Sequence, residues 1–155
     1  PLELLLVIDH NEALLERAEQ IGGAFNVAVT DTAGGLLAFA RMDGAFAVSG
    51  AIAQDKAWTV AGFGGLPTDV FYDAIAGEDA VREGIGQRGR VAAFGGGVPV
   101  VVDGTFVGAV GASGGSAAQD KDVASAGAAA VTAAHRATLP DAAGAHRPNS
   151  GEDAR

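Results

Sequence analysis

The chain has 155 residues, and a chain of this length is expected to form one domain that buries a core of its own. A formal net charge of −9 argues against nucleic-acid binding, for which a basic stripe is the usual signature. The absence of cysteine excludes disulfide bonds and thiolate metal sites.

The first predicted elements are a helix and a β-hairpin. Asp9 and Glu12 have the spacing of a capping box, which predicts a helix that runs to Ile21 and ends at the glycine pair after it. Residues 27–31 and 36–41 are predicted as two strands, because the glycines between them supply the positive φ angles of a tight turn.

A second helix is predicted over residues 46–63, and one of its faces is apolar except for a lysine. This face consists of residues at helical spacing: Ser49, Ile52, Ala53, Lys56, Val60 and Phe63. A buried ammonium needs a partner or a wet cavity, so Lys56 has two interpretations. Either its stem covers the core while its head reaches solvent, or it lies at a pocket edge, where Asp43 or another carboxylate restores its charge.

The middle of the chain is predicted to hold a short helix and a loop. Pro67 and Thr68 begin the helix, which continues to Ile75. Residues 77–90 are charged and punctuated by glycine, which predicts a mobile surface loop.

The last part of the chain is predicted to hold three short strands, a helix and a tail. The strands cover residues 91–94, 98–102 and 106–112, and Asp103-Gly104 is a strong signal for a two-residue hairpin turn. Ser116 and Gln119 form a second capping box for an alanine-rich helix that ends near Arg136. The chain therefore divides into a domain at 1–138 and a C-terminal tail at 139–155, where no periodicity remains.

Two segments match the sequence patterns of a cofactor-binding motif and a catalytic motif, but the predicted structure around each segment excludes that function. Residues 84–89 match G-x-G-x-x-G, but no strand precedes them, so the dinucleotide site cannot form. Residues 111–115 match G-x-S-x-G, with Asp120 and His135 following in the hydrolase order. Those two residues would lie about 22 Å apart on one helix, which excludes a triad with Ser113.

Two segments carry a family resemblance: residues 27–45 and 99–115. Each segment is a strand, a glycine turn and a second strand that leads into a helix. The first segment reads VAVTD…AGGLLAF…RMDGA, and the second reads PVVVDG…FVGAVGASGG. Together they resemble the GlcG/HbpS-like haem-binding family, which also supplies the C-terminal domain of PduO-type corrinoid adenosyltransferases. The resemblance covers roughly residues 12–135, most of the chain.

The resemblance implies a profilin-like fold, which is α/β in three layers with a central five-stranded antiparallel sheet. The residues support this fold independently, because hairpin signals alternate with amphipathic helices and no βαβ crossover pattern occurs. The resemblance also implies a homo-oligomer, built from dimers into a larger ring or octamer. An exposed face around Trp58 and an apolar N-terminus favour the same assembly.

Two functions follow from this resemblance. The first is binding of haem or a related tetrapyrrole, with His10 as the iron ligand and Arg41 or Lys56 near a propionate. A solvated histidine in the first turn of a helix is the plainer interpretation of His10. The second function is that of a small-molecule enzyme or pathway accessory protein, in which Lys56, Ser49 and Asp43 line a pocket at an oligomer interface. A third possibility is a purely structural assembly subunit, and the sequence does not decide among the three.

The location of the protein is predicted from its longest early apolar run. Residues 4–8 are far too few to span a bilayer, so we expect a cytoplasmic protein that binds no membrane. Because the sequence begins at Pro1, a signal peptide or tag removed before it stays an open alternative.

Overall fold

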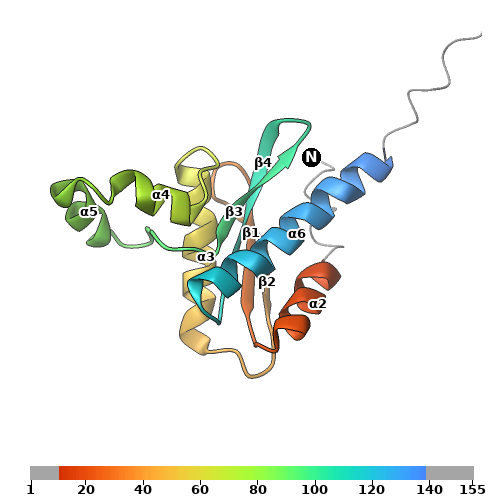
Figure 1. The fold of residues 1–155 in the computed structure, drawn as a ribbon. Helices are drawn as coiled ribbons and strands as arrows, with labels where there is room; N and C mark the ends of the chain where they lie inside the picture. Colours follow the sequence, from red (N-terminus) through yellow and green to blue (C-terminus); the bar gives the residue numbers. More distant parts are fainter. Residues whose placement is uncertain (1–10, 139–155) are drawn as a thin grey trace, which may run out of the picture.

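The computed structural model describes residues 11–138, which form five helices and four strands (Figure 1). The elements in chain order are α2 (Asn11–Ile21), β1 (Asn26–Thr30), β2 (Leu36–Arg41), α3 (Ala47–Gly62), α4 (Thr68–Ile75), α5 (Asp79–Gly86), β3 (Gly97–Val102), β4 (Thr105–Ser113) and α6 (Ala117–Thr138). The predicted tail at 139–155 lies outside the described residues. None of the helices in the described part is long and apolar enough to cross a membrane.

The sheet has four strands in the order β2-β1-β4-β3, and every neighbouring pair is antiparallel. The antiparallel α/β prediction is confirmed, but the prediction of five strands is wrong, because residues 91–94 form no strand. Side chains of two helices hold the backbone there instead: the Ala92 amide donates to Thr59 Oγ1 at 2.9 Å and the Gly97 amide donates to Thr68 Oγ1 at 3.0 Å. The Ala92 amide is therefore held by α3, and the chain joins the sheet only from Gly97.

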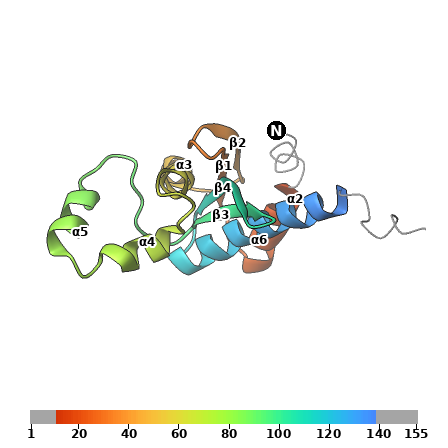
Figure 2. The same cartoon turned by 90° about the horizontal axis from the view of Figure 1, so that it is seen from above.

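Helices cover both faces of the sheet (Figure 2). On one face α6, with α2 packed against it, covers a core of larger side chains. This core includes Leu14, Phe25, Val27, Val29, Val98, Val100, Val110, Val123 and Val131. On the other face Ala53, Ala57 and Val60 of α3 pack against Ala28 and Ala109 of the sheet. The alternation of strand side chains between the two faces produces these two separate cores.

Helix α3 lies unusually close to β4. A Cβ atom added to Gly111 would lie 2.0 Å from the carbonyl oxygen of Ala53, a distance that real Cβ atoms do not reach. The alanines and glycine at this contact are thus a packing requirement, because any larger side chain would separate the helix from the sheet.

Two predicted local motifs are confirmed in detail. Asp103 and Gly104 both have positive φ, 49° and 76°, as a type I′ turn between β3 and β4 requires. At the start of α6 the Ser116 amide donates to Gln119 Oε1 at 2.9 Å, and the Gln119 amide donates to Ser116 Oγ at 3.2 Å. This is a reciprocal capping box.

The prediction of a loop at 77–90 is wrong over α5, although no residue of that helix is buried. Asp79 and Arg82 form an ion pair one turn apart at 3.0 Å, and Arg82 also donates to the Ala76 carbonyl at 2.9 Å. These local contacts stabilise a short helix despite two glycines. Helices α4 and α5 together extend away from the sheet as an arm (Figures 1 and 2).

Candidate functional site

Lys56 and Asp120 form a buried ion pair between α3 and α6. Lys56 Nζ lies 2.7 Å from Asp120 Oδ2 and donates to the Ala112 carbonyl at 3.0 Å. The Lys56 side chain is 0% exposed, so the interpretation of its head reaching solvent is wrong. The Phe94 ring completes its surroundings, with Nζ 4.7 Å from the ring centroid.

Asp120 is fully engaged as well. Its second oxygen, Oδ1, accepts hydrogen bonds from the amides of Gly114 and Gly115 at 3.0 and 2.9 Å. Burial lowers the pKa of the Lys56 ammonium, while the hydrogen bond and negative charge of Asp120 act in the opposite direction. The pair therefore ties α3, β4 and the start of α6 together, and it uses two of the three N–H donors of the Lys56 ammonium.

The sequence contains a signal for this partner in the pattern of α6. Asp120 lies on the buried stripe of α6, at helical spacing with Val123, Ala124, Gly127 and Val131. An acid on one apolar stripe and a base on another predict each other, because each needs a buried counter-charge.

The structure does not bring Ser49 and Asp43 to Lys56. Ser49 is buried on α3, but it lies seven residues earlier, about 10 Å along the helix axis. Asp43 is exposed in the turn between β2 and α3. A joint pocket of these three residues remains a prediction without a contact among them.

Arg41 lies at the end of β2 among exposed apolar side chains. It faces Asn26 across the strand pair, and its guanidinium donates to the Ala45 carbonyl at 2.8 Å. Phe39 and Phe46, which flank it in sequence, are 43% and 70% exposed. This surface combines apolar rings with a cation that has only one of its five N–H donors in a described hydrogen bond.

His10 lies outside the described residues, directly before α2. Leu14 packs against Gly127 and Arg17 pairs with Asp122, so α2 runs antiparallel to α6. The first turn of α2 therefore lies beside the C-terminal half of α6, whereas Lys56 meets the first turn of that helix. Within residues 11–138, no three His, Asp or Glu side chains gather as a metal site.

Trp58, which was expected on an exposed face, is half-buried. The Arg90 guanidinium carbon lies 4.8 Å from its ring centroid, and a Cβ on Gly34 would lie 2.8 Å from its Cδ1 atom. The β1–β2 turn and Arg90 thus cover the tryptophan within one subunit.

Comparison with known proteins gives consistent matches. The family model described as "Haem degrading protein HbpS-like" matches residues 8–129. The chain is 38% identical to Protein GlcG of Escherichia coli over 98 residues, which cover 63% of this chain and 70% of GlcG. It is 35% identical to the corrinoid adenosyltransferase PduO of Salmonella typhimurium over 121 residues, 77% of this chain but only 35% of PduO.

Two solved structures have the same fold. A Klebsiella pneumoniae protein, ORFY, has a TM-score of 0.76 at 30% identity and covers 84% of this chain and 90% of its own. The PduOC:heme complex has a TM-score of 0.71 at 32% identity, with 83% of this chain and 91% of that chain covered. The resemblance inferred from the two hairpin segments is thereby confirmed.

Proposed function

The chain belongs to the HbpS-like family, and on that premise we propose that it binds haem or a related tetrapyrrole. The observation that carries this proposal is the match to the PduOC:heme complex, which extends over four-fifths of the chain at 32% identity. The surface around Arg41 suits such a ligand, because Phe39 and Phe46 offer apolar contact and Arg41 offers donors for a propionate. Haem would supply its own iron chemistry, and the protein would hold and orient it.

Arg41 is a better propionate partner than Lys56. The Lys56 ammonium already binds a carboxylate and a carbonyl in a site closed to solvent, and a propionate would have to displace Asp120. Arg41 is exposed, and among residues 11–138 only one of its N–H donors has a hydrogen-bond partner.

We further propose that the haem site is shared between two subunits, so that His10 of one subunit and Arg41 of another bind the same haem. From Asn11 to Ile21 helix α2 spans about 15 Å, and its far end leads to β1 beside the Arg41 turn, where the Met42 amide donates to the Phe25 carbonyl. A haem bound at the start of α2 would thus need an arginine from a second copy. The exposed Phe46 and Val48 side chains, 70% and 68% accessible, favour a homo-oligomer, and an octamer is the size that the family resemblance implies.

The test is a haem titration followed by absorbance. We expect a saturable Soret band, a changed band for His10→Ala and weaker binding for Arg41→Ala. The matched control Arg88→Ala, an exposed arginine beyond α5, should bind as the parent does. Absence of a saturable band would reject the haem proposal, and identical spectra and affinities for all variants would reject His10 and Arg41 as the residues that hold the haem. Sedimentation of a stable monomer at micromolar concentration would reject the shared site.

The enzymatic alternative has less support. It depends on a lysine available to a substrate, and the Lys56 ammonium is enclosed by Asp120, Ala112 and Phe94. Recovery of a bound metabolite, rather than haem, from purified protein would favour it.

A further inference from the structure

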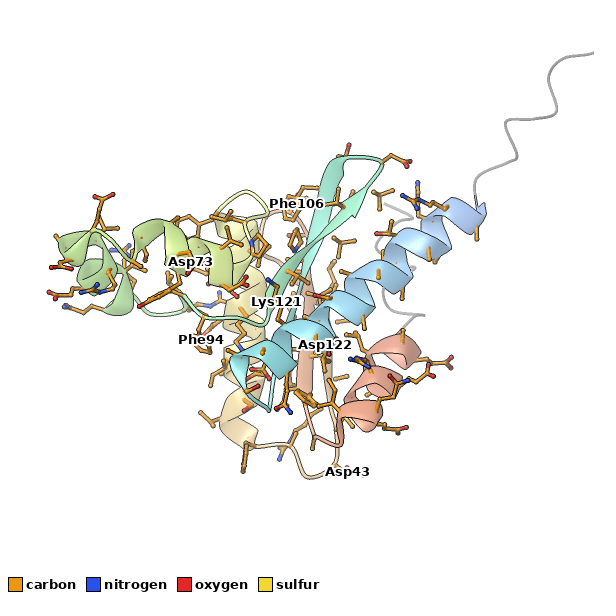
Figure 3. All side chains as sticks on the ribbon, in the orientation of Figure 1. Asp43, Asp73, Phe94, Phe106, Lys121 and Asp122 are labelled. Atoms are coloured by element: carbon orange, nitrogen blue, oxygen red, sulfur yellow. The ribbon has the colours of Figure 1, made fainter. Side chains whose placement is uncertain are left out.

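A cavity of about 280 Å³ lies between α4 and the segment that leads into β3. Figure 3 shows Asp73 on α4 and Phe94 on the segment below it in that view. The lining residues are Asp69, Tyr72, Asp73, Ala93, Phe94 and Gly95. None of them is a residue proposed to hold haem, so this cavity is a separate feature of the molecule.

The charge of the cavity wall is negative. Asp69 Oδ2 is paired with Lys121 of α6, so this carboxylate is already compensated. Asp73 is exposed and has no ion-pair partner among the described residues. The wall therefore presents one uncompensated negative charge, that of Asp73, and a donor that carries positive charge satisfies it best.

Two aromatic rings add to this preference. Tyr72 and Phe94 are 42% and 47% exposed and both line the cavity. Aromatic faces attract cations, and Phe94 already has Lys56 against its ring. Because Asp120 neutralises Lys56, the ammonium behind the Phe94 ring does not make the net charge of the cavity wall positive.

We infer that this cavity binds a small organic monocation, an alkylammonium or a compound of the same charge and size. The volume lies just below the range of about 300–1,000 Å³ that is usual for drug-sized ligands, so the ligand is small. A carboxylate or phosphate would meet the charge of Asp73, and a neutral alcohol would leave that charge unpaired. The ammonium group would lie against Asp73, and the alkyl part against the rings of Tyr72 and Phe94.

The sequence provides a built-in reporter, because Tyr72 is the single tyrosine of the chain. Protein that contains 3-fluorotyrosine would give one ¹⁹F resonance, located at the cavity. We expect n-butylammonium chloride to shift that resonance saturably, whereas 1-butanol and sodium butyrate at equal concentration leave it in place. Asp73→Asn should weaken butylammonium binding by roughly twofold to fivefold, and Asp73→Lys should abolish it.

Glu19→Gln is the matched control, since it removes one exposed carboxylate from α2, outside the cavity. It should bind butylammonium as the parent does, and all variants should retain the parent's circular dichroism and haem titration. The inference is wrong if butylammonium gives no saturable shift, if butanol gives the same shift, or if Asp73→Asn binds as tightly as Glu19→Gln. A failed haem titration alone would count only against the haem proposal.

Discussion

Arg17 of α2 and Asp122 of α6 are joined by two parallel hydrogen bonds, from Arg17 Nε to Asp122 Oδ1 at 3.0 Å and from Nη2 to Oδ2 at 2.6 Å. This bidentate geometry is the strongest form of an arginine–carboxylate contact. The hydrogen bond from Arg17 lowers the pKa of Asp122 below its ordinary 3.8, and the charge of Arg17 adds to this effect while burial opposes it. This contact holds helix α2 against α6.

The Arg17–Asp122 pair predicts that the stability difference between the parent and an Asp122 variant depends on pH. A carboxylate with a lowered pKa in the folded state contributes stability that is fully present above pH 3.8 and is lost as the pH falls through the lowered pKa. We therefore expect Asp122→Asn to lower the melting temperature at pH 7, and we expect the variant to approach the parent's value as the pH falls below 3.8 and through the lowered pKa. Thermal melts across this range test it. A gap between parent and variant that is constant with pH would contradict the assignment, and Glu19→Gln serves as the surface control.

Lys56→Met is predicted to destabilise the fold severely. Methionine keeps an apolar stem of similar length, but it leaves Asp120 as a buried charge without its partner. Removal of one member of a buried pair costs roughly 3–5 kcal/mol. Urea unfolding of the variant measures this loss, and a variant as stable as the parent would show that the ion pair contributes nothing.

The double variant Lys56→Met/Asp120→Asn is the control for that experiment. Asparagine retains an acceptor for the amides of Gly114 and Gly115 while it removes the unpaired charge. We expect it to recover part of the stability that Lys56→Met loses, so that the double-mutant cycle gives a coupling between the two residues. Additive losses would place the cost of Lys56→Met in packing instead of charge.

Gly111→Ala is predicted to lower stability by roughly 1–3 kcal/mol, since overpacking costs that much and the obstructing atom here belongs to rigid backbone. Gly62→Ala is the matched control on α3, where an added Cβ meets no atom within 4 Å. That change should stabilise the helix by up to about 1 kcal/mol. Equal effects of the two substitutions on denaturant unfolding would show that α3 can move away from β4 without cost.

Replacement of Asp103-Gly104 by two alanines is predicted to cost roughly 1–3 kcal/mol. Both positions have positive φ, which alanine resists. Asp103→Asn alone keeps a residue suited to that conformation and should be close to neutral. Melting temperatures of the two variants decide the matter, and an unchanged value for the alanine pair would mean that the turn relaxes to another type.

The parts of the fold that the sequence predicted well are those encoded locally. The turn at Asp103-Gly104 and the capping box of Ser116 and Gln119 each depend on residues no more than three positions apart, and both are confirmed. Helix α5 was predicted as a loop because its sequence contains two glycines and many charged residues, which are typical of loops. The Asp79–Arg82 ion pair, which supports the helix, is a weaker signal in the sequence. Residues 91–94 look like a strand, but Thr59 binds the Ala92 amide from a distant part of the chain.

The candidate site shows the same division. Periodicity on α3 correctly identified Lys56 as a lysine on a buried face, yet its partner lies 64 residues later on another helix. The prediction named Asp43 or another carboxylate as the partner, and the structure places Asp120, at the start of α6 directly after β4, beside the lysine. His10 was chosen for its position before α2, and its role stays a prediction.

The position of Trp58 has a consequence for optical spectroscopy. It is the single tryptophan of the chain and lies beneath Arg90 on the α3 side of the sheet, where the small-residue core lies. The fluorescence of Trp58 therefore reports when α3 separates from the sheet. Far-ultraviolet circular dichroism, by contrast, is dominated by α6 and α3 together, the two longest helices described. Coincident transitions by the two probes would mean that both layers unfold as one cooperative unit, and separated transitions would reveal the layer that loosens first.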